Sequence, residues 1–244
     1  MNHHLSTDRA TFSHPIALAV LALTFFSIGP AWGQFVAFTG KDSNALDEFA
    51  FVALTEIPNG TKIFVTNLDW DNTMGQFSAT GEGTLLFTAA ENIARGTVVR
   101  VNETTDTSDL FAVTPGTAGT AALVGATSWT PTAGDPHYAF TATNDADPIN
   151  TVTEIYAALL TQTVAPNNLD PSTGTNASVD AIVADFTGGS QPAGIDYSAD
   201  RSMATPTTLA TTSNFTAGAG TITLDLSPFS GPGLPVELVE FSVD

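Results

Sequence analysis

The sequence contains no cysteine. This absence excludes disulfide bonds, thiolate zinc sites and a cysteine nucleophile. A protein outside the cytoplasm that lacks disulfides must be stabilised by its apolar core or by bound ions. The composition supports such a core, because 43% of the residues are hydrophobic and about 200 residues suffice for one domain with a sizeable interior.

Basic residues are also scarce. Only 6 Lys and Arg residues stand against 25 Asp and Glu residues, so the formal net charge is −19. We therefore expect neither nucleic acid nor anionic lipid as a partner, since phosphate binding depends on Lys and Arg. Positively charged surfaces and divalent cations are compatible with this charge, and so is a solubility role in a salt-rich habitat. All three explanations stay open.

Motifs for catalysis and cofactor binding are few. After residue 33, His137 is the only histidine, whereas a catalytic zinc site draws on two or three. The chain has neither a G-x-S-x-G elbow nor a glycine-rich nucleotide fingerprint. We therefore predict a non-enzymatic protein with no catalytic residue and no cofactor other than calcium. A glycoside or ester hydrolase is a second alternative, since two carboxylates can meet in space from distant positions; Glu82 and His137 would be the residues to test.

Residues 1–33 predict a signal peptide. An apolar run over residues 16–28 follows Arg9, and the small residues Ala31 and Gly33 suit cleavage before Gln34. This run is shorter than the roughly 20 residues that a membrane-spanning helix needs. Cleavage removes one basic and one acidic residue, so the net charge stays at −19. We expect a secreted or cell-surface protein without membrane insertion, in which residues 34–230 form one domain.

The densest strand pattern begins at Phe49. Residues 49–54 are apolar at every position, which predicts a central strand buried on both faces. Pro58 and Gly60 then suit a turn. Residues 62–70 alternate, so that Phe64, Leu68 and Trp70 share one face. Asn67, Asp69 and Asp71 share the other face, which we expect to meet water.

Two acidic clusters are candidate calcium sites, because calcium prefers carboxylate and carbonyl oxygens. The first contains Asn67, Asp69 and Asp71, and the second contains Asp145 and Asp147. The alternative for both is a polar edge or turn, in which Asn and Asp bond to the nearby main chain.

Two tryptophans remain after cleavage, Trp70 and Trp129. Either ring could bind a ligand by stacking against a sugar, which makes a carbohydrate-binding module the first alternative function. The other interpretation is that both rings belong to the core.

The rest of the chain predicts an all-β fold. Short apolar stretches alternate with segments rich in Gly, Pro, Asn and Thr, and no long amphipathic helix intervenes. This spacing favours an antiparallel β-sandwich, either jelly-roll-like or an Ig-like Greek key. We expect further strands at residues 84–87, 97–101, 121–124, 127–129, 137–141, 152–160, 179–186 and 220–226, and loops over 104–119, 164–177 and 188–212.

Residues 57–65 contain a turn that ends on a glycine and leads into a strand, and residues 93–101 show the same pattern. Because two copies are too few for a solenoid, the echo predicts two similar corners of one sandwich.

Three motifs carry a resemblance to a known family. They are DEFAFVALTEIPNGTKIFVTNLDW at residues 47–70, GEGTLLFTA from residue 81 and AGDPHYAF at residues 133–140. They resemble a module of secreted and surface proteins of bacteria, in which the first motif reads dGFaFVaLvdIPaGTxIyfTDneW. The chain departs from the TDNEW portion at residues 66–70. The resemblance covers most of residues 34–215 and implies a β-sandwich, often joined to other extracellular modules.

The segment LPVELVEFSVD at residues 234–244 resembles the stretch that opens a fibronectin-like or sorting module in secreted bacterial proteins. Residues 231–244 are therefore predicted to be a linker, the start of a truncated module or a final strand. Taken together, the sequence predicts a structural, adhesive or surface-display module, with an extracellular glycan or another cell-surface component as its partner.

Overall fold

The computed structural model describes residues 35–230 except for 45, 73, 79–82, 106–108, 126–127 and 162–180. The predicted signal peptide, the loop over 164–177, Glu82 and the LPVEL segment lie outside the described residues.

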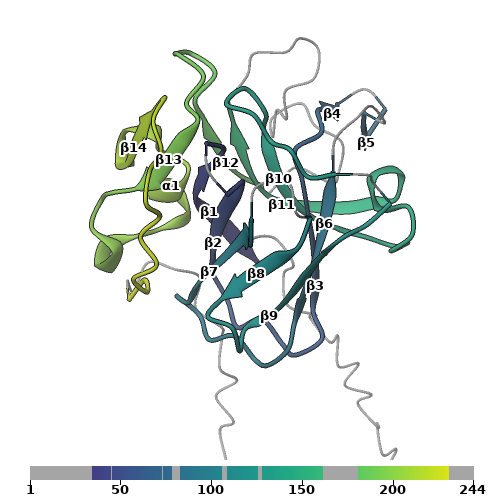
Figure 1. Ribbon diagram of the computed structural model, residues 1–244. Helices are drawn as coiled ribbons and strands as arrows, with labels where there is room; N and C mark the ends of the chain where they lie inside the picture. The colour runs from purple at the N-terminus through teal and green to yellow at the C-terminus, as the bar shows by residue number, and fades with distance from the viewer. Residues whose placement is uncertain are drawn as a thin grey trace, which may run out of the picture. The chain divides into compact units, whose positions relative to one another are not determined.

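Two six-stranded sheets pack against each other (Figure 1). The first sheet contains, in spatial order, β14 (Phe215–Gly218), β13 (Gly194–Tyr197), β1 (Val36–Asp42), β2 (Glu48–Ala53), β7 (Val98–Glu103) and β8 (Phe111–Thr114). The second contains β12 (Ile182–Asp185), β11 (Val152–Leu160), β10 (His137–Ala142), β3 (Lys62–Thr66), β6 (Thr84–Ala89) and β9 (Gly119–Leu123). The predicted all-β sandwich is confirmed.

The remaining elements are short. A two-stranded ribbon of β4 (Trp70–Asp71) and β5 (Gln76–Phe77) follows β3. The helix α1 (Pro206–Leu209) and the 3-10 helices Pro148–Asn150, Arg201–Met203 and Thr212–Asn214 complete the described structure. Strand pairs are antiparallel, except that β11 and β12 run parallel.

The core lies between the two sheets, and β2 is at its centre, as predicted. Residues 49–54 have no exposed surface. Phe51 of β2 meets Phe87 of β6 edge to face, with ring centroids 5.4 Å apart. A second apolar cluster covers the other face of the second sheet, where Phe64 and Phe140 stack at 5.5 Å beneath the β4–β5 ribbon. Burial of these rings supplies the main stabilising free energy of the fold.

Two equivalent corners carry the chain between the sheets, as the internal echo predicts. One joins β2 to β3 and the other joins β6 to β7. The amide of Gly60 donates to the carbonyl of Ala89 at 2.8 Å, and the amide of Gly96 donates to that of Ala53 at 2.7 Å. Both glycines have positive φ, at 82° and 84°, which a side chain would oppose. Each corner therefore donates a main-chain hydrogen bond to the other.

The antiparallel order of the strands separates two ends of the sandwich. We call the end with these two corners the corner end. The loop end is opposite and carries the connections between β1 and β2, β3 and β6, β7 and β8, and β9 and β10.

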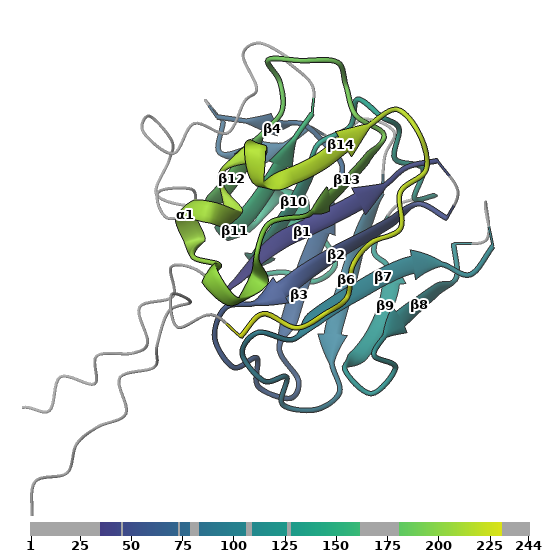
Figure 2. The same cartoon turned by 90° about the vertical axis from the view of Figure 1, so that its left-hand side faces the viewer.

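An extended segment over residues 219–230, which we call the strap, crosses the outer face of the first sheet (Figure 2). Its main chain lies close to that sheet because glycines lie beneath it. A Cβ atom added to Gly194 would lie 2.8 Å from the carbonyl oxygen of Gly220, and one added to Gly40 would lie 2.7 Å from the side chain of Leu224.

The strap does not form the strand predicted at residues 220–226. Its side chains do alternate, with Leu224 buried and Thr223 exposed. However, the strap crosses the strands below it, so its amides bond to side chains. The amide of Ile222 donates to Asp42 at 2.8 Å, and that of Asp225 donates to Asp196 at 3.0 Å.

Arg201 holds the strap down. Its guanidinium donates to the carbonyls of Ser227 and Asp225, both at 2.8 Å. It also pairs with the Asp225 carboxylate at 3.1 Å and lies 4.5 Å from the centroid of the Phe229 ring. Charge-assisted hydrogen bonds and a desolvated cation–π contact are among the stronger polar interactions available.

Three further predictions of local structure were wrong in part. The loop predicted over 104–119 contains β8, and the one predicted over 188–212 contains β13 and α1. Residues 128–130, at the end of the strand predicted over 127–129, form no strand. The described residues contain no helix of the length and apolarity needed to cross a membrane.

Candidate functional site

Trp129 lies inside the loop end and has no exposed surface. Its ring packs 5.9 Å from Phe49 and 5.6 Å from His137, centroid to centroid. Its indole N–H donates to the carbonyl of Asp47 at 3.2 Å, and its main-chain N–H donates to the Asp109 carboxylate at 2.9 Å. Trp129 therefore connects two loops, and it offers no ring face to a sugar.

Trp70 is equally buried, on the other side of the second sheet. It meets Phe77 with ring centroids 4.9 Å apart, and its indole N–H donates to Asn72 at 3.2 Å. The stacking interaction proposed for a carbohydrate needs an open ring face, and the structure provides one at neither tryptophan. This premise of the ligand-binding prediction was wrong.

The first calcium cluster is divided between the interior and the surface. Asn67 is only 1% exposed, so the expectation that it faces water was wrong, and neither of its amide atoms has a hydrogen-bond partner. Asp69 is half-buried, and burial together with the nearby Asp135 carboxylate raises its pKa. The Asp71 carboxylate accepts the amide of Met74 at 3.0 Å, inside the β4–β5 turn.

The second calcium cluster has partners within the protein. Asp145 pairs with Lys62, and Asp147 accepts a hydrogen bond from Asn150 at 2.8 Å. Among the residues that the structure describes, no three His, Asp or Glu side chains gather as a metal-binding group.

Lys41 is the most unusual ionisable residue of the loop end. Its side chain has no exposed surface. The ammonium donates to the carbonyl of Asp135 at 2.8 Å and to those of Thr132 and Ala133 at 3.4 Å. Burial lowers the pKa of Lys41 to about 8, although the Asp135 carboxylate opposes this shift. These carbonyls close over the ammonium, so it fixes the loop before β10.

His137 is enclosed by aromatic rings and is 1% exposed. The rings of Phe38 and Phe49 lie 6.3 and 6.2 Å from it, and its Nδ1 has no hydrogen-bond partner. Burial, reinforced by the charge of Lys41, lowers the pKa of His137 well below its usual value. The ring is therefore neutral, and its surroundings leave no path for a substrate to reach it.

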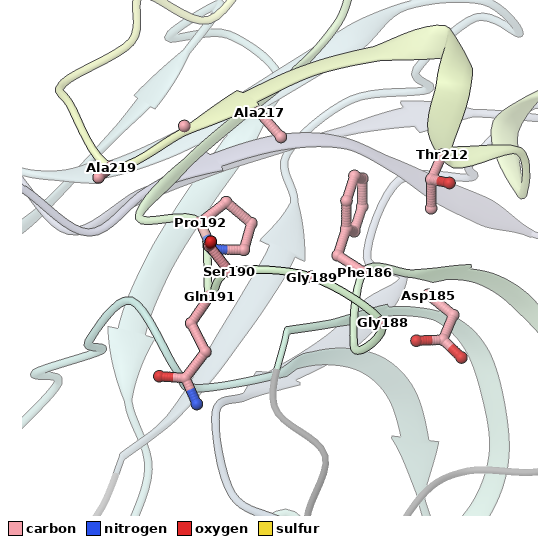
Figure 3. A pocket seen from close by; sticks show the side chains of 11 residues that line it. Asp185, Phe186, Gly188, Gly189, Ser190, Gln191, Pro192, Thr212, Ala217 and Ala219 are labelled. Carbon is pink, nitrogen blue, oxygen red and sulfur yellow. The ribbon is translucent and has the colours of Figure 1, made fainter.

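A cavity of about 440 Å³ lies between β14 and the loop that joins β12 to β13 (Figure 3). Its walls are mostly small residues, among them Gly188, Gly189, Ala217 and Gly218. Among the described residues that line it, Phe186 is the one aromatic side chain and Asp185 the one charged side chain, and Ser190, Gln191 and Thr212 are polar. In Figure 3 the Asp185 and Gln191 side chains point away from each other, so these described groups do not converge as the polar groups that fix the orientation of a small ligand do.

Two features of the loop end were missed in the sequence. Asp47 and Asp109 have positive φ, at 42° and 48°. Beside them, Leu46 and Leu110 are 37% and 66% exposed. A Leu-Asp and an Asp-Leu dipeptide give no local signal of such geometry, which depends on the distant Trp129.

No protein-family model, curated protein or solved structure was found to match this chain.

Proposed function

We propose that this chain is an extracellular, non-enzymatic display or adhesion module that contacts a cell-surface component through its loop end. The observation that carries the proposal is the position of the two ends of the described fold. The amide of Leu54 donates to the carbonyl of Phe35 at 3.1 Å, and the amide of Phe229 donates to that of Gly96 at 2.8 Å. The described fold therefore begins and ends at the corner end, and the loop end lies opposite both of these points, where it can face a partner.

The use of the buried cations also supports a non-enzymatic role. Lys41 and Arg201 both bond to main-chain carbonyls that hold distant segments in place. A general acid or base must come within hydrogen-bond reach of its substrate. These two groups instead serve the stability of the sandwich.

Epitope tags at opposite ends test the display geometry. One tag is inserted between Gly188 and Gly189, which lie in the exposed loop that follows β12 at the loop end. The matched tag is inserted between Gly116 and Thr117, in the exposed turn that joins β8 to β9 at the corner end. On intact cells that make the protein, we expect antibody to bind the first tag and to bind the second much less.

Equal binding to both tags, or no binding on intact cells, would contradict the display geometry. Hydrolysis of ester or glycoside substrates by the purified protein would contradict its non-enzymatic character.

A further inference from the structure

We propose that Leu46 and Leu110, which we call the leucine pair, form the centre of a docking site for a basic polypeptide. This inference rests on the proposed display role and names the chemistry of the partner. The described chain exposes four large apolar side chains, and three of them, Leu46, Met74 and Leu110, lie in connections at the loop end.

The leucine pair flanks the end of β7. The carbonyl of Leu46 accepts the amide of Glu103 at 2.9 Å, and the carbonyl of Leu110 accepts the amide of Thr104 at 2.8 Å. The two leucines therefore occupy the positions of the strands on either side of β7, roughly 10 Å apart given the spacing of strands in a sheet. This separation suits two apolar side chains of one partner surface.

The main chain beside each leucine is held in an unusual conformation. Asp47 and Asp109 are the only non-glycine residues of the described chain with positive φ, and each adjoins one member of the pair. Conformations of this kind cost free energy and persist only where surrounding contacts impose them, often at ligand clamps. Here one buried residue, Trp129, bonds to both aspartates. Trp129 therefore fixes the main chain beside both leucines, whose side chains stay exposed.

Charge identifies the partner. Asp47 and Asp109 lie partly exposed beside the pair, and no exposed Lys or Arg of the described chain lies at this end. Lys41 is buried, and Arg100 of β7 is half-buried and pairs with the Glu48 carboxylate at 3.5 Å. Lys62 and Arg95 are exposed at the corner end. A partner with aliphatic side chains ringed by Lys or Arg complements this surface. A second copy, which carries the same net charge of −19, and an anionic membrane would both be repelled.

A pair of synthetic peptides tests the site on the purified full chain. One alternates Lys and Leu, and the other alternates Lys and Ser, so that their charge is equal. We expect the Lys/Leu peptide to bind about tenfold more tightly, as burial of the two leucines would give. The double variant Leu46→Ser/Leu110→Ser should bind both peptides equally. Met203→Ser is the matched control, because Met203 is 67% exposed at the corner end.

Several results would overturn the docking site. One is that the double variant still binds the Lys/Leu peptide more tightly than the Lys/Ser peptide. Another is that Met203→Ser also abolishes this preference. Dimerisation, or binding to phosphatidylcholine vesicles, that the double variant abolishes would assign the leucine pair to another occupant. Unfolding midpoints of all variants guard against loss of the fold.

Trp129→Phe tests whether Trp129 fixes the main chain beside the leucine pair. Phenylalanine keeps an aromatic ring in the core but loses the donor to Asp47. We expect the Lys/Leu preference to fall several-fold, and an unchanged preference would overturn the role of Trp129. Peptide binding by purified protein does not depend on where the cell places it. Failure of the tag experiment would therefore overturn the display role alone, and equal affinity for the two peptides would overturn the docking site alone.

Discussion

Ile57 and Ile93 exchange two main-chain hydrogen bonds, with the amide of each donating to the carbonyl of the other at 2.9 and 2.8 Å. They are equivalent residues of the two corners, so the corners are related by an approximate two-fold axis at this pair. The relation extends to Gly60 and Gly96, which have almost the same φ. Their surroundings differ, because only Gly96 lies beneath the strap.

This difference makes the two glycines a matched pair. A Cβ atom on Gly60 would meet nothing within 4 Å, whereas one on Gly96 would overlap the carbonyl oxygen of Phe229. We expect Gly60→Ala to lower the free energy of unfolding by about 1 kcal/mol, the cost of a side chain at positive φ. Gly96→Ala should cost about 3 kcal/mol, since the steric clash adds to it. Urea unfolding measures both, and equal losses would contradict the close packing of the strap.

Loss of Arg201 should release the strap. We expect Arg201→Met to lower the free energy of unfolding by about 2–4 kcal/mol, because carbonyls of the strap lose their donors and Asp225 loses its partner. Chymotrypsin should then cut after Leu224 or Phe229 while the sandwich stays folded. Lys62→Met is the control, because an exposed ion pair contributes only about 0–1 kcal/mol. Strap cleavage at the wild-type rate in Arg201→Met would contradict this anchoring role.

Lys41 should make stability depend on pH in the alkaline range. Its pKa is about 8 in the folded protein and 10.5 as the ordinary value. Between these values the unfolded chain binds more protons, so the free energy of unfolding rises with pH. From pH 7.5 to 9.5 we expect this group to add about 2 kcal/mol. Urea unfolding of Lys41→Met should lack that rise, and parallel profiles for the two proteins would show that the ammonium is not desolvated.

Asp196 should act in the opposite sense at acid pH. Burial raises its pKa to about 6 from 3.8, although the hydrogen bond from the Asp225 amide and the charge of Arg201 oppose this shift. The folded protein holds this proton more tightly, so the contribution is present in full below pH 3.8 and is lost as pH rises through 6.

The comparison protein is Asp196→Asn, which keeps an acceptor for the Asp225 amide. From pH 7 to 5, wild-type protein should gain about 1 kcal/mol in unfolding free energy relative to this variant. A constant difference between the two proteins over that range would contradict the prediction.

The parts of the fold that could be predicted were those with strong local patterns. The continuous apolar run at residues 49–54 gave β2 within one residue of each end, and the apolar stretch at 152–160, which contains Tyr156, gave β11 with its observed bounds. The four-residue strands β8 and β13 are too short to show a period. The strap shows how pattern can mislead: its residues alternate as a strand would, but its amides bond to Asp42 and Asp196, which lie far away in the sequence.

The candidate site was less predictable because it depends on contacts between distant segments. Nothing local to Trp129 shows that its two N–H groups reach Asp47 and Asp109. Lys41 likewise lies near the end of β1, where a charged residue would be expected at the surface, and the carbonyls of Thr132, Ala133 and Asp135 explain its burial. The composition did show that cations are scarce, and the basic character of the proposed partner is inferred from that scarcity.

The position of the strap has a consequence for the order of assembly. It rests on β13, β1 and the corner at Gly96, and it is the last described segment to leave the ribosome. Both sheets can thus complete their hydrogen bonding while the backbone at Gly40 and Gly194 is still bare. A released chain that ends before Ile222 would be a nearly finished sandwich with an uncovered outer surface, which is the kind of intermediate that joins with its neighbours.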